Sequence, residues 1–318
     1  MPEGLEIDHE KSLNGTMAAY AEQVLICTGK DDWMSRIEDE NAGDNLAADI
    51  KELLGRGGVY RDVCISPVLT LDCANDWQPY HNISVINSSF QSSVPERREI
   101  QTTSAYILPS FKYVPFLPRV SFDSVQALVK GYLLPKKLHP AHDNLSPIHR
   151  DRLLRSESQG SFLYGVQDVE DMLVLICGHG GRDGRCGVMG PVLREEFERQ
   201  LPGQGYQVLK GPVESSPNRD ELLLEDAKRE QAGKGIARVG LISHIGGHKF
   251  AGNVILYFPP GLKGKDGKRH ALAGCGIRYG RVEPRHVDGI LKETLGNGRV
   301  VEELFRGGIR QGGEILRL

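Results

Sequence analysis

The sequence predicts an α/β protein made of two similar lobes, and three observations support this fold class. The apolar segment V-L-I-C at 24–27 recurs 150 residues later at 174–177. The spacing of apolar residues in 120–133 recurs in 282–295, at an offset of 162 residues. In each half the first segment is a typical buried strand and the last is an amphipathic helix. We therefore predict an internal duplication with one copy in each half.

The carboxy-terminal copy alternates apolar runs with helical patterns. We expect strands at 172–177, at 207–210 and near Ala237, Asn253 and Ala271, and helices at 191–201, 220–231 and 282–295. A strand-helix-strand-helix-strand-strand-helix order is thioredoxin-like, with helices covering a mixed sheet.

The amino-terminal copy follows the same plan less clearly. We expect strands at 23–28 and near Val68, Ile83 and Tyr106, and helices at 47–54 and 121–133. Residues 135–147 carry three prolines and no apolar period, which is typical of a linker. The predicted organisation is a degenerate thioredoxin-like domain at 1–134, a linker at 135–164 and a second thioredoxin-like domain at 165–318.

Composition excludes several classes of protein. The chain has 318 residues, of which 39% are hydrophobic, and can bury two ordinary cores. Its net charge of −3 gives no reason to expect nucleic acid as a partner. No apolar stretch approaches the roughly 18 residues that a membrane span needs. Six unevenly spaced cysteines do not suggest a secreted disulfide framework, so we expect a reducing compartment.

Four residues of the carboxy-terminal copy form a complete set of metal ligands. Cys177 ends the strand at 172–177, and Cys186 follows it across a segment with four glycines. His244 and His248 follow the strand near Ala237 and bracket Ile-Gly-Gly, which indicates a loop rather than a helix. We expect Cys186 likewise to lie across a flexible loop, because glycine allows the backbone to approach an inorganic centre closely.

Zinc and a [2Fe-2S] cluster both suit two cysteines and two histidines. Zinc is the more common occupant, but its cysteines usually lie two to four residues apart in a short module. Here they are nine positions apart. A [2Fe-2S] cluster spans a wider cage and accepts two thiolates on one iron and two imidazoles on the other. The spacing therefore favours the cluster.

These motifs resemble the fungal sucrase/ferredoxin-like family. The resemblance rests on C-x8-C, on H-x-G-G-H, on G-H-K-F-A-G-N-V at 247–254 and on Y-G-R-V-x-P-x-H-V at 279–287. It implies that the second lobe is a thioredoxin-like ferredoxin whose [2Fe-2S] cluster is ligated by Cys177, Cys186, His244 and His248. It also implies a mitochondrial protein. The visible amino terminus does not look like a mitochondrial presequence, because residues 1–10 are acidic; a removed presequence and a cytoplasmic protein are the alternatives.

Only the second lobe can bind metal by this scheme. Cys27 occupies the place of Cys177, but Arg36 stands where Cys186 would correspond, and Asn87 and Ser88 replace the histidines. His179, inside the cysteine segment, is a weaker candidate for a ligand, because a fifth donor is not needed. The other cysteines, Cys27, Cys64, Cys73 and Cys275, read as small buried hydrophobic residues.

The predicted function is one-electron transfer, coupled to protonation of the histidines, rather than an enzyme with its own substrate. Two imidazoles in place of two thiolates raise the reduction potential. The sequence names neither the electron donor nor the acceptor, nor the oligomeric state. A zinc-stabilised interaction module and a thiol oxidoreductase remain open, although no C-x-x-C motif supports the latter. No catalytic residues and no nucleotide-binding motif are predicted.

Overall fold

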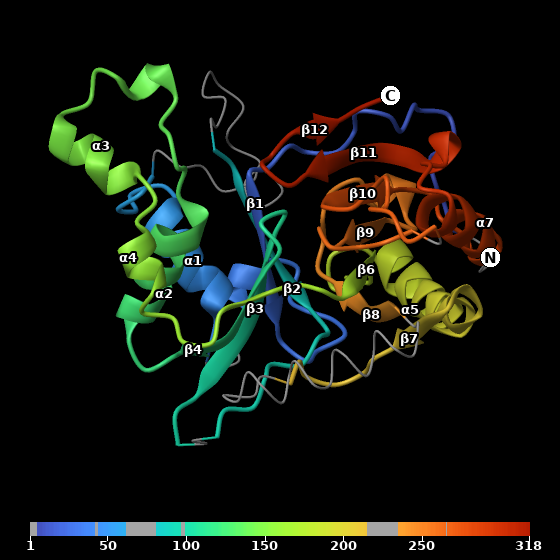
Figure 1. The fold of residues 1–318 in the computed structure, drawn as a ribbon, viewed down its shortest axis with the longest axis horizontal. Helices are drawn as coiled ribbons and strands as arrows, with labels where there is room; N and C mark the ends of the chain where they lie inside the picture. Colours follow the sequence, from blue (N-terminus) through green and yellow to red (C-terminus); the bar gives the residue numbers. More distant parts are fainter. Residues whose placement is uncertain (1–4, 42–43, 62–80, 97–98, 215–234, 265) are drawn as a thin grey trace.

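The computed structural model describes residues 5–41, 44–61, 81–96, 99–214, 235–264 and 266–318 (Figure 1). Within these residues the strands form one mixed sheet in the order β12-β11-β10-β9-β6-β8-β2-β1-β3-β4-β5, with β7 paired to β8 off this path. The strands are β1 Glu22–Cys27, β2 Ile83–Ser88, β3 Thr102–Leu108, β4 Lys112–Pro118, β5 Gln167–Asp168, β6 Met172–Cys177, β7 Tyr206–Val208, β8 Gly235–Ile242, β9 Val254–Phe258, β10 Cys275–Tyr279, β11 Phe305–Arg310 and β12 Ile315–Leu316.

Helices gather at the two ends of the molecule. Those of the amino-terminal half and the following connection lie at one end, and α5 and α7 lie at the other (Figure 1). The α-helices are α1 Leu46–Leu54, α2 Phe122–Leu128, α3 Pro147–Leu153, α4 Glu157–Gly160, α5 Gly184–Gln200 and α7 Pro284–Ile290. Shorter 3-10 and π turns are η1 Ile37–Asp39, η2 Val129–Leu133, η3 Pro140–His142, η4 Leu201–Gln204, η5 His248–Phe250, η6 Leu291–Gly296 and η7 Glu302–Leu304. No helix of the described part is long and apolar enough to cross a bilayer.

The two halves share a strand order. In the first half β1 is parallel to β2 and antiparallel to β3, which is antiparallel to β4. In the second half β6 is parallel to β8 and antiparallel to β9, and β9 is antiparallel to β10. Parallel neighbours need a long crossover, whereas antiparallel neighbours can follow one another directly. The fold is therefore α/β with a mixed sheet, as the sequence predicts.

The sheet continues from one half into the other through β2 and β8. Ser88 is the register partner of Ile242 in an antiparallel pair. The N–H of Ser243 donates to the carbonyl of Asn87 at 2.9 Å, and the N–H of Asn87 donates to the hydroxyl of Ser243 at 3.0 Å. This junction lies directly before His244, so the amino-terminal half contacts the carboxy-terminal half beside the predicted ligands.

The amino-terminal segment before β1 packs on the carboxy-terminal half. The N–H of Asp8 donates to the carbonyl of Lys249 at 2.8 Å, and the guanidinium of Arg281 donates to the carbonyls of Asp8 and Lys11 at 2.5 and 2.6 Å. These contacts span more than 200 positions of sequence. The segment before β1 therefore packs on the carboxy-terminal half, although it precedes every strand of the amino-terminal half.

Several predicted elements are confirmed and others are wrong. The strands at 23–28, 172–177 and near Ile83, Tyr106, Ala237 and Asn253 are present, as are the helices at 47–54, 121–133 and 282–295, the last two ending in π turns. The helix predicted at 191–201 begins seven residues earlier, and the strand predicted near Ala271 begins at Cys275. The strand near Val68 and the helix at 220–231 lie outside the described residues.

The elements that sequence reasoning missed have local reasons. Strand β4 contains Pro115 and Pro118, and proline removes a donor from the ladder, so its pattern does not read as a strand. Helices α3 and α4 lie in the segment predicted as linker. Strand β11, with two consecutive glycines, lacks the apolar density of a typical buried strand. The domain boundaries themselves remain a prediction.

Candidate metal centre

Cys177 and Cys186 come from a strand and a helix that pack directly on each other. Cys177 is the last residue of β6, and Cys186 lies in the first turn of α5. The predicted loop between the two cysteines is present at 178–183, but Cys186 itself lies just beyond it, in the helix. A Cβ on Gly190 would lie 2.5 Å from the Cα of Gly178. A side chain there would push the helix away, so glycine permits the approach that brings the two thiols together.

The start of α5 is fixed by Asp183. Its carboxylate accepts the N–H of Arg185 at 3.0 Å as the helix N-cap and also pairs with the guanidinium of Arg185. This hydrogen-bonded pair lowers the pKa of Asp183 to about 2. The amides at a helix N-terminus carry partial positive charge, which favours an anionic group such as a thiolate in the first turn. Cys186 has this position.

His244 and His248 are brought together by a glycine turn. Gly246 and Gly247 both have positive φ, of 84° and 74°, a conformation that other residues rarely adopt. The chain therefore doubles back, and the two imidazole centroids lie 5.3 Å apart with an angle of 39° between the rings. His244 is half-buried and His248 is exposed. The predicted loop conformation of this motif is confirmed.

Three of the four predicted ligands form a compact donor set. One ligand atom each of Cys177, Cys186 and His244 lies within 4.8 Å of the others. The Nδ1 atom of His244 is buried and has no hydrogen-bond partner among the described residues. Such an atom is costly unless something binds it, and the donor set is one that zinc or iron accepts. His248 lies next to His244 but outside this set, and its role as a ligand stays a prediction.

The two thiols share their proton unequally. The proximity of the Cys186 sulfur, with the imidazole of His244 and the backbone of His179, lowers the pKa of Cys177 well below its ordinary value. The same proximity raises the pKa of Cys186. Cys177 thus favours the thiolate and Cys186 keeps its proton. A metal cation that binds both sulfurs can replace that proton.

His248 favours its neutral form. Partial burial lowers its pKa from the ordinary value, and His244 and two neighbouring arginines act in the same direction. A neutral imidazole is the form that binds metal. The surroundings of His248 therefore favour the neutral, metal-binding form of its ring over the protonated form.

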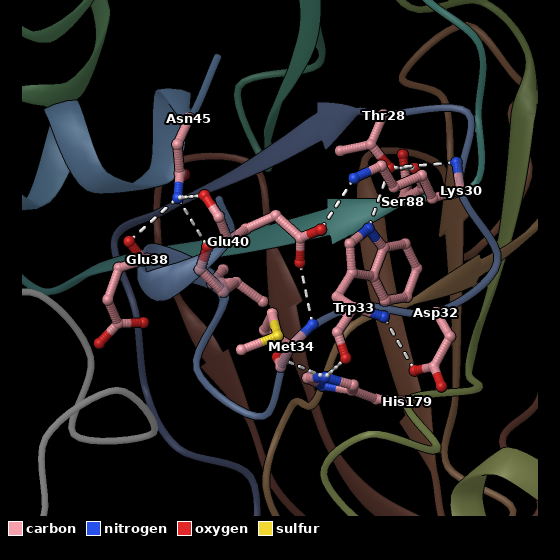
Figure 2. Close-up of polar contacts among 11 residues, drawn as sticks. Thr28, Lys30, Asp32, Trp33, Met34, Glu38, Glu40, Asn45, Ser88 and His179 are labelled. Carbon is pink, nitrogen blue, oxygen red and sulfur yellow. Dashed lines mark hydrogen bonds and ion pairs between the residues drawn. The ribbon is translucent and has the colours of Figure 1, made fainter. Parts of the chain in front are cut away.

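His179 positions the backbone of His244 and is no ligand, because both of its ring nitrogens are occupied. Its Nε2 lies 3.1 Å from the carbonyl of Trp33 and 2.9 Å from that of Met34, contacts that Figure 2 shows. Its Nδ1 accepts the backbone N–H of His244 at 3.0 Å. These partners fix the tautomer with the proton on Nε2. These hydrogen bonds agree with the sequence interpretation that His179 is not needed as a fifth donor.

The segment around Trp33 closes over the cysteine segment. The carboxylate of Asp32 accepts the N–H of Gly181 at 3.1 and 3.0 Å. A Cβ on Gly181 would lie 2.2 Å from the carbonyl oxygen of Trp33, so the two backbones are in direct contact. In Figure 2 the indole of Trp33 points back to Thr28, with a hydrogen bond of 3.0 Å to its hydroxyl. The amino-terminal half thus packs directly on the segment between the two cysteines.

Two buried arginines support the histidine loop, and sequence reasoning missed both. Arg278 and Arg306 are 3% and 2% exposed, and they donate to the carbonyls of Ile245 and Gly246 at 3.3 and 3.0 Å. The only available signal was Arg278 between the apolar residues of β10, because β11 has no clear apolar pattern. The arginines of the cysteine segment are engaged elsewhere: Arg185 pairs with Asp183, and Arg182 donates to Ser35 at 3.2 Å.

The remaining cysteines of the described residues lie apart from this site. Cys275 is buried at the start of β10, where its register partner is Phe258, the last residue of β9. Ile176, the neighbour of Cys177, pairs with Val254, the first residue of β9. Cys275 and Cys177 therefore lie at opposite ends of β9. Cys27 ends β1, and burial raises its pKa to about 12. Both are small buried hydrophobic residues, as predicted. Cys64 and Cys73 lie outside the described residues.

Comparison with known proteins identifies relatives over most of the chain. A model of the sucrase/ferredoxin-like family matches residues 13–307. A protein of Debaryomyces hansenii named altered inheritance of mitochondria protein 32 is 28% identical over 313 residues, which cover 96% of this chain and 89% of the relative. A protein of the same name from Meyerozyma guilliermondii is 30% identical over 231 residues, which cover 72% of this chain and 66% of the relative. No solved structure matches the chain significantly.

Proposed function

Because the chain belongs to the sucrase/ferredoxin-like family, we propose that it is a redox protein whose carboxy-terminal half holds a [2Fe-2S] cluster. Cys177, Cys186, His244 and His248 are the proposed ligands. The single observation that carries this proposal is the buried donor set of Cys177, Cys186 and His244 with the unpartnered Nδ1 of His244. When bound, the cluster supplies a centre that takes up and releases one electron.

The ligand types favour a raised potential. The thiolates of Cys177 and Cys186 carry one negative charge each, whereas neutral His244 and His248 carry none. Compared with four thiolates the site has two fewer negative charges, so an added electron is resisted less. The exposed position of His248 also gives its ring access to protons from water. We therefore propose that uptake of an electron is coupled to uptake of a proton by a histidine.

A zinc site is the second candidate, and the compact three-donor set is the observation that favours it. Zinc binds two cysteines and one or two histidines at a single centre. His248 lies beside this set rather than within it, which suits a two-iron centre better than one metal ion. Zinc would make the protein a stabilised interaction module without redox activity.

A thiol oxidoreductase is the less favoured alternative. Exchange with another disulfide requires that a thiolate reach its partner. Cys177 and Cys186 are only 1% and 0% exposed, and they come from a strand end and a helix rather than from a C-x-x-C turn. Buried thiols that face an unpartnered imidazole are better suited to hold metal than to attack a protein substrate.

We also infer that the two halves are copies of one thioredoxin-like unit. The shared strand order supports this, as does the position of Cys27 and Cys177 at the ends of corresponding strands β1 and β6. Arg36, Asn87 and Ser88 stand where the first copy would need ligands. The first copy is therefore proposed to serve as a scaffold for the second.

We place the protein in mitochondria, because the relatives that cover most of it are named for the inheritance of mitochondria. Its redox donor and acceptor are proposed to be proteins, since electron transfer by a carrier needs both.

Absorption and EPR spectroscopy of the purified protein, with metal analysis, test the cluster. We expect a brown protein with two iron and two sulfide per chain and an S = 1/2 signal after reduction, as for a [2Fe-2S] centre. A colourless protein with one zinc per chain would show that the second candidate is correct. Disulfide reductase activity that disappears in Cys177→Ser would instead support the third.

A further inference from the structure

Two arginines are buried beside the candidate centre without a carboxylate to balance them. Arg278 and Arg306 are almost wholly buried, and within the described part of the chain neither forms an ion pair. Two other arginines with largely buried side chains differ: Arg119 pairs with Asp44 and Asp49, and Arg238 pairs with Asp171 at 2.6 Å. A buried charge is costly unless an opposite charge lies beside it, so two buried cations without a counter-charge require an explanation.

Both guanidinium groups are directed at the loop that carries the histidines. Arg278 donates to the carbonyl of Ile245, and Arg306 donates to that of Gly246, which are consecutive residues between His244 and His248. A Cβ on Gly247 would lie 2.5 Å from Nη2 of Arg306, so loop and guanidinium are in van der Waals contact. The cations lie behind the loop, on the side away from water.

Arg306 is held in place from several directions. Its Nε donates to the hydroxyl of Thr16 at 2.9 Å, its Nη2 to the carbonyl of Thr16 at 3.0 Å and its Nη1 to the side chain of Asn253 at 2.5 Å. All of these acceptors are neutral. Burial beside Arg278 lowers the pKa of Arg306 to about 9, while the nearby sulfurs of Cys177 and Cys186 favour its charged form. The side chain is therefore still a cation at neutral pH.

We propose that Arg278 and Arg306 are a built-in positive charge that favours the reduced form of the cluster site, an inference that rests on the proposed function. Two iron(III), two sulfides and two thiolates with neutral imidazoles sum to zero charge. One electron from a one-electron donor brings the sum to −1 and breaks no bond. Buried cations attract the added charge strongly, because the protein interior screens them less than water does. A zinc site of the same ligands never gains that charge.

This role differs from that of the surface arginines. The guanidinium of Arg185 is paired with Asp183, so its charge is largely balanced. Arg182 is on the outer side of the cysteine segment, where it donates to Ser35 and water screens its charge. Among the arginines that the structure describes, only Arg278 and Arg306 are both buried and without a carboxylate partner.

Potentiometric titration of charge-changing variants, followed by EPR, tests the proposal. We expect Arg306→Gln to lower the ratio of reduced to oxidised centre about tenfold at a fixed ambient potential, which is about 59 mV in the midpoint of a one-electron couple. Arg306→Lys keeps the charge and should retain most of the wild-type midpoint. The matched control is Arg238→Gln combined with Asp171→Asn, which removes a buried guanidinium together with its own counter-charge and should leave the midpoint unchanged.

The outcomes separate this inference from the proposed function. Equal midpoints in wild type and Arg306→Gln, or equal shifts in the Gln and Lys variants, would overturn the inference while the cluster stands. A colourless wild-type protein would overturn the proposed function and with it the inference. If Arg306→Gln does not fold, Arg278→Gln and Arg278→Lys carry the same comparison, because Arg278 donates to the same loop.

Discussion

The backbone N–H of His244 donates to Nδ1 of His179 at 3.0 Å, although the two residues are 65 positions apart in sequence. The opposite nitrogen of His179 contacts the carbonyls of Trp33 and Met34, some 145 positions away. One imidazole therefore connects the amino-terminal half to the main chain of a proposed ligand. The position of His244 depends on contacts that both halves supply.

Removal of this connection should weaken metal retention. In His179→Ala the hydrogen bonds of both ring nitrogens are lost, each worth about 1 kcal/mol, so His244 is held less firmly. We expect metal to be lost to a chelator several times faster than from wild type, as followed by visible absorption. His179→Asn, whose amide oxygen can replace Nδ1 as an acceptor, should rescue part of the effect.

A control distinguishes this effect from general loss of stability. His149→Gln changes a histidine in α3, in the segment that follows the first lobe, and should leave metal retention unchanged. If His179→Ala releases metal no faster than His149→Gln does, the positioning role of His179 is wrong.

Replacement of a histidine ligand should lower the reduction potential. In His248→Cys a thiolate adds one negative charge to the site, so reduction becomes less favourable. The proton that the imidazole takes up on reduction is also lost. Above the pKa of the oxidised state, we expect the wild-type midpoint to fall with rising pH, by up to about 59 mV per unit for one proton and one electron. Protein-film voltammetry between pH 5 and pH 10 should show a lower and flatter profile for His248→Cys, whereas an identical profile would contradict the proposed ligation.

A side chain at Gly190 should destabilise the protein and separate the two thiols. The Cβ of Gly190→Ala would meet the backbone of Gly178 at 2.5 Å, and neither backbone can move without shifting β6 or α5. Overpacking of this kind costs roughly 1–3 kcal/mol. Urea unfolding of the metal-free protein should show that loss, and the variant should bind less iron during reconstitution.

Gly184→Ala is the matched control for this change. Gly184 lies at the start of the same helix, and nothing lies within 4 Å of the Cβ that it would gain. We expect it to unfold at a urea concentration close to that of wild type. Equal destabilisation by both variants would show that the close contact between Gly190 and Gly178 is not what brings the cysteines together.

The pair of Asp183 with Arg185 should make the stability of the metal-free protein depend on pH in the acid range. The pKa of Asp183 is about 2 in the folded protein, below its ordinary value of 3.8. Stability from this depressed pKa is therefore present above about pH 4 and is lost as the pH falls towards 2. Since the pair is partly exposed, we expect about 1 kcal/mol from it at neutral pH.

Asp183→Asn tests the direction of this pH dependence of stability. The amide can still cap the helix but cannot pair with Arg185. The free energy of unfolding of the variant should be lower than that of wild type at pH 7, and the two should converge near pH 2. A difference that stays constant across this range would show that capping alone accounts for the effect.

Local sequence pattern determined the strands β1 and β6 and identified the four proposed donors. An apolar run such as Leu173 to Ile176 can only be stable when buried, and its period identifies the strand without knowledge of its neighbours. Cysteine and histidine are recognised by their chemistry and spacing alone. This is why the site could be proposed before the fold was known.

The tertiary structure decided what surrounds those donors. The glycines of the cysteine segment predict a loop, but they do not predict that Asp183 caps a helix at its end or that Gly190 of this helix packs on Gly178. The tautomer of His179 and the unbalanced charge of Arg306 likewise depend on partners more than 60 positions away. Hydrogen bonds and close backbone contacts between distant segments leave no periodic signal in the chain, because only folding brings their partners together.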